Sequence, residues 1–333
     1  MKNIYSFPVL VIIIFLFFSV NPVFSREQTD TDYGFSLAPQ FGFISGKALE
    51  LVYPDQSRPH IDLLSELTWE MKPVYYLGIQ IDIKRNDIMS ATGFFSSISF
   101  KMGIPGVSGI HENRDWMNLH NNNLTHFSSH TNNTKQFFWL DAVFGISIPA
   151  GNFYLKPFIS GSWMRFSFSG TDGYGNYTWF TPPDVSYSGQ EVIRYQQDWF
   201  ILAIGFSAGT KILSSFSVDL TFQISPFTYC AARDDHLPVI LPPPFSNTNH
   251  KIFKDYTSLG LFLEPSAAIS FSAGRFDFSL IGAYRYIGKT RGTSYLDNNN
   301  TGYFSKIGNA GASLSFFDIR FLAGIKIWQN LKN

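Results

Sequence analysis

The chain has 333 residues, and its 25 basic and 25 acidic side chains leave a formal net charge of zero. A chain without a basic excess does not attract a polyanion, so this balance argues against nucleic acid as a partner. Only 15% of the residues are charged while 17% are aromatic, whereas soluble proteins carry about 25% charged residues. The composition therefore argues against a chain whose whole surface faces water.

The first 25 residues have the organisation of an export signal. Lys2 is followed by an apolar run over residues 7–18, which is shorter than the ~20 residues of a membrane-spanning helix. Small residues then suit a cleavage site. The sequence predicts residues 1–25 as a signal peptide and residues 26–333 as the mature domain. Removing Lys2 leaves 24 basic against 25 acidic residues.

Segments in which apolar and polar residues alternate recur along the rest of the chain. In residues 33–43, YGFSLAPQFGF, Phe35 and Leu37 fall on one face, and Ser36 and Gln40 on the other. A period of two is the signature of a β-strand. The same character predicts strands at residues 61–72, 74–84, 136–148, 152–168, 191–209, 215–225, 257–272, 275–280 and 317–327.

Two architectures fit about ten such strands. In a soluble sandwich the apolar faces point inward, whereas in a membrane barrel they face lipid and the polar faces line the interior. Most segments approach or exceed the ~9–11 residues that a tilted strand needs to cross a bilayer, and only a closed barrel pairs every backbone group in lipid. With the export signal, this favours an all-β fold: a ten-stranded antiparallel transmembrane β-barrel of the bacterial outer membrane, in contact with its lipid.

The connections are expected to alternate in length. Short turns at residues 149–152 and 272–275 are typical of periplasmic hairpins. Four long polar segments have the character of extracellular loops: residues 85–134, 169–190, 231–254 and 288–310. Because about eight strands are already filled by side chains, we expect ion pairs to plug a ten-strand barrel, which argues against a general porin.

Two polar clusters in these long segments could carry chemistry. Residues 110–117 read IHENRDWM, and residues 231–239 read AARDDHLPV. In an extended segment Asp234 and His236 point to the same side with backbones ~6.6 Å apart, so the carboxylate and the imidazole can meet. A histidine held by a carboxylate can take a proton from water near neutral pH. The alternative interpretation is a polar loop without a catalytic role.

The remaining polar motifs carry no chemistry that we can assign. Five further histidines are interpreted as solvated loop residues: His111, His120, His126, His130 and His250. No ligand set has the spacing of a metal site, so no metal is expected. The single cysteine, Cys230, cannot form an internal disulfide and is interpreted as a small apolar filler.

Taken in order, several segments resemble the omptin family of outer-membrane proteases. The matching segments are SGKALELVY (45–53), ELTWEM (66–71), NRDWM (113–117), RYQQDWF (194–200), DDH (234–236), YLDNNNTGYFSKIGNAG (295–311) and LAGIKI (322–327). The resemblance implies a ten-strand barrel with an extracellular active-site groove. It also implies an aspartic endopeptidase that hydrolyses peptides or proteins at the cell surface without a cofactor.

The resemblance assigns a role to each catalytic position. In the family, a water molecule lies between an Asp pair and an Asp-His pair. Here His236 matches the general base, Asp234 its orienting partner and Asp115 the second member of the Asp pair, whereas the first member falls on Asn113. An amide can position a water but cannot accept its proton. The nearest replacement, Glu112, faces away from Asp115 in an extended segment.

Two functions therefore stay open at the level of the sequence. The first is an omptin-like endopeptidase that Asn113 impairs. The second is an omptin-like barrel without peptidase activity, acting as an adhesin or a structural surface protein. The distinction depends on whether an amide at position 113 is compatible with the chemistry.

The resemblance also implies contacts with substrate and lipid. Glu50 matches an acidic residue at the bottom of the family's S1 pocket, but its acidic companion corresponds to Ala232, with Arg233 beside it, so basic side chains should bind less tightly. Arg165 matches one arginine of the family's lipopolysaccharide site. Asp198 stands where another is expected and would repel phosphate. We therefore expect no activation by lipopolysaccharide.

Overall fold

The computed structural model describes residues 33–54, 62–85, 92–118, 123–178, 184–240 and 249–329. The predicted signal peptide lies outside the described residues. Fourteen strands are present in this part of the chain: β1 (Tyr33–Tyr53), β2 (Ser65–Arg85), β3 (Gly93–Gly103), β4 (Gly106–Asp115), β5 (His126–Ala150), β6 (Phe153–Tyr177), β7 (Asp184–Ser186), β8 (Glu191–Leu213), β9 (Phe216–His236), β10 (Lys251–Ser258), β11 (Phe262–Ala273), β12 (Phe276–Ile287), β13 (Arg291–Asn298) and β14 (Ser305–Gln329). None of the described residues forms a helix long and apolar enough to span a membrane.

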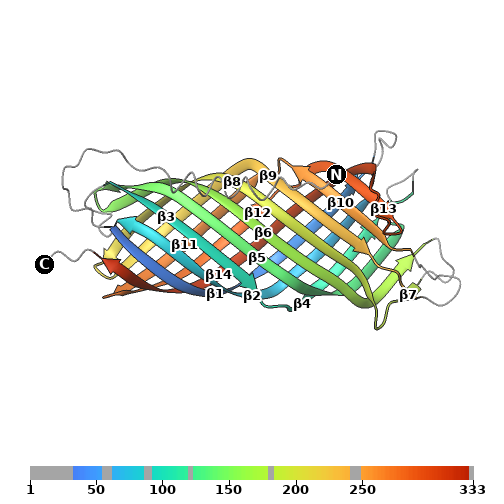
Figure 1. Ribbon diagram of the computed structural model, residues 1–333, viewed down its shortest axis with the longest axis horizontal. Helices are drawn as coiled ribbons and strands as arrows, with labels where there is room; N and C mark the ends of the chain where they lie inside the picture. Colours follow the sequence, from blue (N-terminus) through green and yellow to red (C-terminus); the bar gives the residue numbers. More distant parts are fainter. Residues whose placement is uncertain are drawn as a thin grey trace. The chain divides into compact units, whose positions relative to one another are not determined.

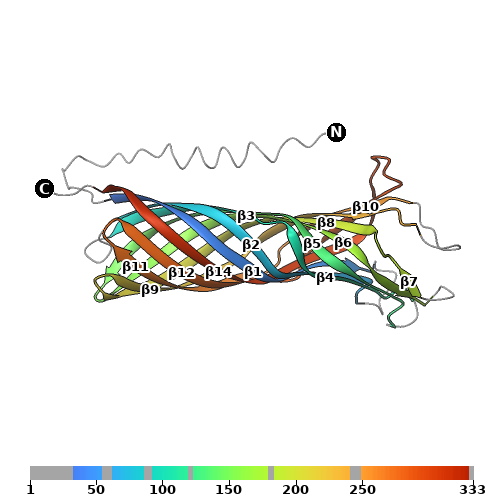
Figure 2. The ribbon, with the colours of Figure 1, turned by 90° about the horizontal axis from the view of Figure 1, so that it is seen from below.

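The strands close into an antiparallel barrel. β1 pairs with β2 on one side and with β14 on the other, and the latter pairing runs from Gly34–Gln329 to Tyr53–Asn309. Three pairs of elements, β3 with β4, β11 with β10 and β12 with β13, are consecutive pieces of one strand each, because both members share the same neighbours. β7 pairs only with β6, outside the ring. The prediction of ten antiparallel strands is thus confirmed (Figures 1 and 2).

The outer face of the barrel is apolar, as predicted for a membrane protein. On β2, Leu77 is 55% exposed and Ile79 is 42% exposed, whereas the intervening Tyr76 is fully buried. On β1, Gln40 points inward while Phe41 is half exposed. The faces are those of a membrane barrel and not of a soluble sandwich, in which the apolar side chains would be the buried ones.

Two of the predicted strands form one. Residues 61–72 and 74–84 were expected as separate strands, but β2 runs through residues 65–85. Its register against β1 shifts at Pro73, so that Met71 and Val74 both point inward. An irregularity of this kind reverses the period of two, which makes a continuous strand resemble two separate ones.

One strand that was not predicted brings the number of strands back to ten. Residues 93–115, assigned to the long loop 85–134, form β3 and β4. The other three predicted loops are also strand in part, because β6 and β7, β9 and β10, and β13 and β14 extend into them. Beyond the hydrocarbon layer the outward face is free to be polar, so alternation disappears although the strand continues. β4, β7, β10 and β13 all lie toward this end of the barrel (Figure 1).

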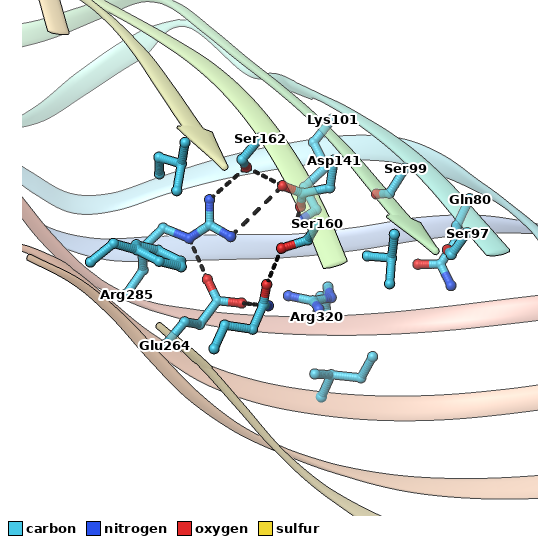
Figure 3. A pocket seen from close by; sticks show the side chains of 15 residues that line it. Gln80, Ser97, Ser99, Lys101, Asp141, Ser160, Ser162, Glu264, Arg285 and Arg320 are labelled. Atoms are coloured by element: carbon cyan, nitrogen blue, oxygen red, sulfur yellow. Dashed lines mark hydrogen bonds and ion pairs between the residues drawn. The ribbon is translucent and has the colours of Figure 1, made fainter. Parts of the chain in front are cut away.

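Ion pairs fill the middle of the barrel, as predicted (Figure 3). Arg285 binds Glu264 and also lies 3.7 Å from an oxygen of Asp141. Lys101 Nζ lies 3.7 Å from Asp318 and 3.8 Å from Asp141. All of these groups except Asp318 border a cavity of about 190 Å³, so charged side chains from several strands hold the barrel together from inside.

An apolar cluster fills much of the remaining interior, which the alternating pattern did not predict. Phe137 and Phe166 stack with ring centroids 5.0 Å apart, and Trp139 packs edge-on against Phe316. Trp69 and Trp199 belong to the same cluster and are fully buried. A narrow barrel must be filled by side chains of some kind, and here large aromatic rings take this role.

Removing one member of the central ion-pair group should destabilise the barrel. Arg285→Met leaves Glu264 and Asp141 without their common cation, and breaking a buried pair costs about 3–5 kcal/mol. The matched control is Arg194→Met, because Arg194 forms only an exposed pair with Glu191, worth about 0–1 kcal/mol. Heat-modifiable gel migration should show a lower unfolding temperature for Arg285→Met alone. Equal shifts in the two variants would contradict the assigned role.

Candidate active site

One wall of the candidate site is the end of β9. Asp234 Oδ2 accepts a hydrogen bond from His236 Nε2 at 2.6 Å, so the contact expected from their spacing is present. Asp234 is 2% exposed, whereas the imidazole of His236 is partly open to solvent. β9 lies between β8 and β10, whose residues Tyr195 and Phe253 pair with Asp234. The pair thus stands on a paired strand and not on a loop.

The opposite wall is the end of β4. Asn113 and Asp115 lie on the same face, and Asn113 Nδ2 donates to Asp115 Oδ2 at 3.3 Å. Ser65 of β2 donates to Asn113 Oδ1 at 3.2 Å, which fixes the orientation of the amide. β5, β6 and β8 separate β4 from β9 around the ring. The Asn113–Asp115 pair and the Asp234–His236 pair therefore stand on opposite sides of the barrel mouth.

Glu112 does not replace the missing carboxylate. It forms an ion pair of 2.6 Å with Arg114 on the other face of β4, as the alternation of side chains predicts. The register of β4 is irregular only between Val107 and Gly109, well before Glu112. The structure therefore offers no bulge that would turn this carboxylate toward Asp115.

The charges of the two walls influence each other. Burial opposes the positive charge of His236, but the carboxylate of Asp234, its hydrogen bond and the charge of Asp115 together raise the pKa of the imidazole above its usual value. Burial raises the pKa of Asp115, against the opposing effects of the Ser65 hydrogen bond and of the charges of His126 and His236. The charges of His236 and Asp115 thus favour each other across the barrel mouth.

The carboxylate of Glu50 lies in the same space. It is on β1 and only 2% exposed. Burial and the negative charges of Asp234, Asp255 and Asp115 raise its pKa well above the usual value. Ala232 also points inward and is buried. Arg233 lies on the outer face of β9, where it pairs with an aspartate at 2.9 Å, so its charge is directed away from Glu50.

A hydrogen-bonded bridge crosses the interior beside the site. Gln197 on β8 donates from its amide to the carbonyl of Leu49 on β1 at 2.9 Å, and to the hydroxyl of Tyr195. Trp199 donates its indole N–H to the Gln197 carbonyl oxygen at 2.9 Å. β8 and β1 are opposite members of the ring. Gln197 pairs with Ala232, two residues before Asp234 on β9, so the bridge lies next to the Asp234–His236 pair, and no pattern in the sequence predicted it.

Two of the histidines expected to be solvated are buried. His111 stacks on Trp69 with ring centroids 3.8 Å apart and donates from Nδ1 to the carbonyl of Thr68 at 3.2 Å. His130 donates to the carbonyl of Asp172 at 2.6 Å. Burial lowers the pKa of both rings, so they are neutral packing residues. The prediction failed because β4 and β5 are strands here, with an inward face.

His126 and His250 are partly exposed, and His120 lies outside the described residues. Among the side chains that the structure describes, no three His, Cys, Asp or Glu residues are arranged to hold a metal ion. Cys230 is buried in the apolar cluster, as predicted.

Arg165, the residue that the resemblance assigned to lipid binding, pairs with Asp198. Arg165 donates to both carboxylate oxygens of Asp198, at 2.7 and 3.1 Å. Asp198 also accepts hydrogen bonds from Trp163 and Gln196. The guanidinium of Arg165 is therefore matched by a carboxylate within the protein.

Comparison with known proteins decides the family. The model of the Omptin family matches residues 31–328, almost the whole described chain. The chain belongs to the Omptin family. This membership confirms the predicted resemblance and the location in the bacterial outer membrane with surface-exposed loops, and it supports an outer-membrane protease. A search of curated proteins found no match.

A solved structure shows the same fold, and others are similar at much lower scores. The outer membrane protease OmpT from Escherichia coli superposes with a TM-score of 0.75 at 17% sequence identity, covering 91% of this chain and 99% of that one. The translocator domain of the autotransporter NalP from Neisseria meningitidis has a TM-score of 0.28 and 10% identity, with 90% of each chain covered. The toluene transporter TodX of P. putida has a TM-score of 0.30 and 8% identity, with 88% and 90% covered.

Asp255 is a site residue that the sequence analysis missed. It is 4% exposed on β10, opposite Ala232 of β9 and Ser294 of β13. The predicted strand 257–272 begins only two residues after Asp255. If this strand is extended toward the N-terminus, alternation places Asp255 on the same face as Thr257. The polar outer face of β10 concealed this continuation.

The carboxylate of Asp234 should control the titration of His236. Asp234→Asn removes the charge that raises the pKa of the imidazole, so we expect this pKa to fall to the ordinary histidine value or below. NMR titration of labelled histidine in detergent-solubilised protein measures the effect. Asp235→Asn is the matched control, because Asp235 pairs with Arg233 on the outer face. A pKa of His236 that is unchanged in Asp234→Asn would contradict the pairing.

Proposed function

We propose that the chain is an omptin-type aspartic endopeptidase, which hydrolyses peptides or proteins at the cell surface with a water activated by Asp234 and His236. The observation that carries this proposal is the hydrogen bond of 2.6 Å between these side chains, with Asp115 across the barrel mouth. The tautomer with a proton on Nε2 leaves a lone pair on Nδ1, which can accept a proton from water.

The residues of this chain have distinct parts in the proposed reaction. His236 takes a proton from the water as it attacks the peptide carbonyl, and Asp234 stabilises the resulting imidazolium. His236 then returns the proton to the leaving amine. Asp115 accepts a hydrogen bond from the water and holds it in position for attack. No residue in this sequence of steps requires a metal or a cofactor.

Asn113 changes which protonation state of Asp115 is favoured. Its amide N–H points at Asp115 Oδ2, so it supports the charged form of that carboxylate. A second carboxylate at position 113 would instead repel Asp115 unless the two shared a proton. The amide can therefore orient the water through Asp115, but it cannot receive a proton itself. We expect catalysis that is reduced relative to a protein with two carboxylates.

The second candidate function is a barrel without peptidase activity, acting as an adhesin or a structural surface protein. Asn113 is the observation that favours it, because it removes one ionisable group from the site. The two candidates differ in a measurable property, which is cleavage by the unmodified protein.

Refolded protein should cleave members of a peptide library. His236→Ala should reduce the rate by about 10²–10⁴-fold, which is the usual contribution of a general base, and Asn113→Asp should increase it. Rates by mass spectrometry measure both effects, with Asp184→Asn, an exposed carboxylate of β7, as the control. No cleavage by the unmodified protein but cleavage by Asn113→Asp would support the second function. If neither the unmodified protein nor Asn113→Asp cleaves any peptide, the proteolytic function is rejected.

We also propose that activity does not require a lipopolysaccharide-type lipid. Arg165 is paired with Asp198 at 2.7 Å, so a phosphate would have to displace a carboxylate to reach the guanidinium. Adding purified lipopolysaccharide to detergent-solubilised protein should change the cleavage rate by less than about twofold. The reason is that the lipid gains no contact with Arg165 that would favour an active state over an inactive one. Asp198→Asn should introduce a response to the lipid. Strong activation of the unmodified protein would contradict this proposal.

A further inference from the structure

Side chains stand opposite each other in pairs on the inner face where β4 meets β5. The pairs on this face are His111 with His130, Asn113 with Ser128 and Asp115 with His126. Opposite residues have Cβ atoms about 4.5–5.5 Å apart, and the rings of His111 and His130 do stack, with centroids 5.7 Å apart. The regular ladder therefore places His126 beside the carboxylate of Asp115, on the wall of the site in which an amide replaces a carboxylate.

One hydroxyl group determines the tautomer of His126. Thr125 Oγ1 donates its only proton to the backbone carbonyl of Asp115 at 2.9 Å, and it accepts the backbone N–H of Met117 at 3.0 Å. The same oxygen lies 2.9 Å from His126 Nδ1, so in this contact the ring nitrogen has to be the donor. Neutral His126 thus carries its proton on Nδ1 and its basic lone pair on Nε2.

Asp115 and His126 each favour the charged form of the other. Burial lowers the pKa of His126, and the negative charge of Asp115 opposes this effect. Burial raises the pKa of Asp115, and the Ser65 hydrogen bond and the charge of His126 oppose that effect. From the strand on the other side, Tyr177 of β6 faces His126 with ring centroids 5.2 Å apart. His126 is therefore neutral near pH 7, and Asp115 stabilises a proton that arrives on it.

We propose that His126 is a positioning residue for Asp115, and that the two side chains form one proton-accepting pair, which replaces the carboxylate missing at position 113. This inference rests on the proposed endopeptidase function and adds a residue to it. The amide of Asn113 cannot accept a proton, whereas the imidazole directly opposite Asp115 can. The barrel mouth then has a carboxylate–histidine pair on each wall, because Asp234 and His236 form the other one.

The pair accounts for the second proton of the attacking water. The first proton passes through His236 to the leaving amine as the C–N bond breaks. The second stays on the hydroxyl of the new carboxyl group, and Asp115, which holds this oxygen, takes it up when the O–H bond breaks. Asp115 passes the proton to His126 Nε2 and is again a carboxylate. His126 is partly exposed, so it releases the proton to solvent, and both histidines are again neutral.

NMR of labelled histidine tests the pair without requiring cleavage. The signal of His126 is identified by its loss in His126→Gln, and its nitrogen shifts should place the proton on Nδ1 near pH 7. Asp115→Asn should lower the pKa of His126 further, because it removes the charge that opposes the effect of burial. Glu112→Gln is the matched control, since Glu112 pairs with Arg114 on the other face of β4. A proton on Nε2, or an unchanged pKa of His126 in Asp115→Asn, overturns the inference.

Cleavage rates test whether the pair replaces the carboxylate. His126→Gln should lower kcat at least about tenfold with KM changed less than about twofold, because proton transfer is affected and substrate binding is not. In the Asn113→Asp background the same substitution should lower kcat less than about threefold, since a carboxylate at position 113 can then accept the proton. His250→Gln, which removes a partly exposed histidine before β10, is the control and should leave kcat unchanged.

The outcomes separate this inference from the proposed function. Heat-modifiable migration first establishes that each variant is folded. If the unmodified protein cleaves peptides, the absence of an effect of His126→Gln, or an equal loss of kcat in both backgrounds, overturns the inference alone. Cleavage that appears only after Asn113→Asp also overturns it, because His126 then does not replace the carboxylate. If neither protein cleaves any peptide, the endopeptidase function is rejected. The titration then decides: dependence of the pKa of His126 on Asp115 supports the pair, and independence overturns it.

Discussion

The need to pair every backbone N–H and C=O group in a hydrocarbon layer governs this structure. Lipid offers these groups no partner, so a sheet that crosses it has to close on itself, and here β1 meets β14 along an almost unbroken ladder. The ladders continue beyond the apolar band. As a result, Asp115 and His236 stand at the ends of paired strands, and the positions of these side chains are set by the barrel rather than by a loop.

Much of the fold could be predicted from the sequence, because the exposure of Leu77 and the burial of Tyr76 follow directly from alternation. Alternation depends on lipid, however, and it ends where the lipid ends. β4 and β10 lie past that limit, which is why buried His111 and Asp255 were missed, whereas the local Asp234–His236 contact could be predicted from spacing alone. Contacts between distant strands left no comparable pattern in the sequence.

The site combines one conventional wall with one altered wall. The Asp234–His236 pair is complete, and the charge of Asp234, its hydrogen bond and the charge of Asp115 raise the pKa of the imidazole in spite of burial. On the other wall an amide replaces a carboxylate beside Asp115. On β10, next to β9, Asp255 is buried and pairs with Ala232.

The bridge from Gln197 to the carbonyl of Leu49 determines by which route a bound molecule can leave the site. Together with the aromatic cluster and the central ion pairs, it obstructs the route from the mouth toward the short turns at the opposite end. Anything bound beside Glu50 has to leave by the opening through which it arrived. For the proposed endopeptidase, a cleaved fragment that has not yet left would occupy the place of the next substrate, so turnover would be subject to product inhibition.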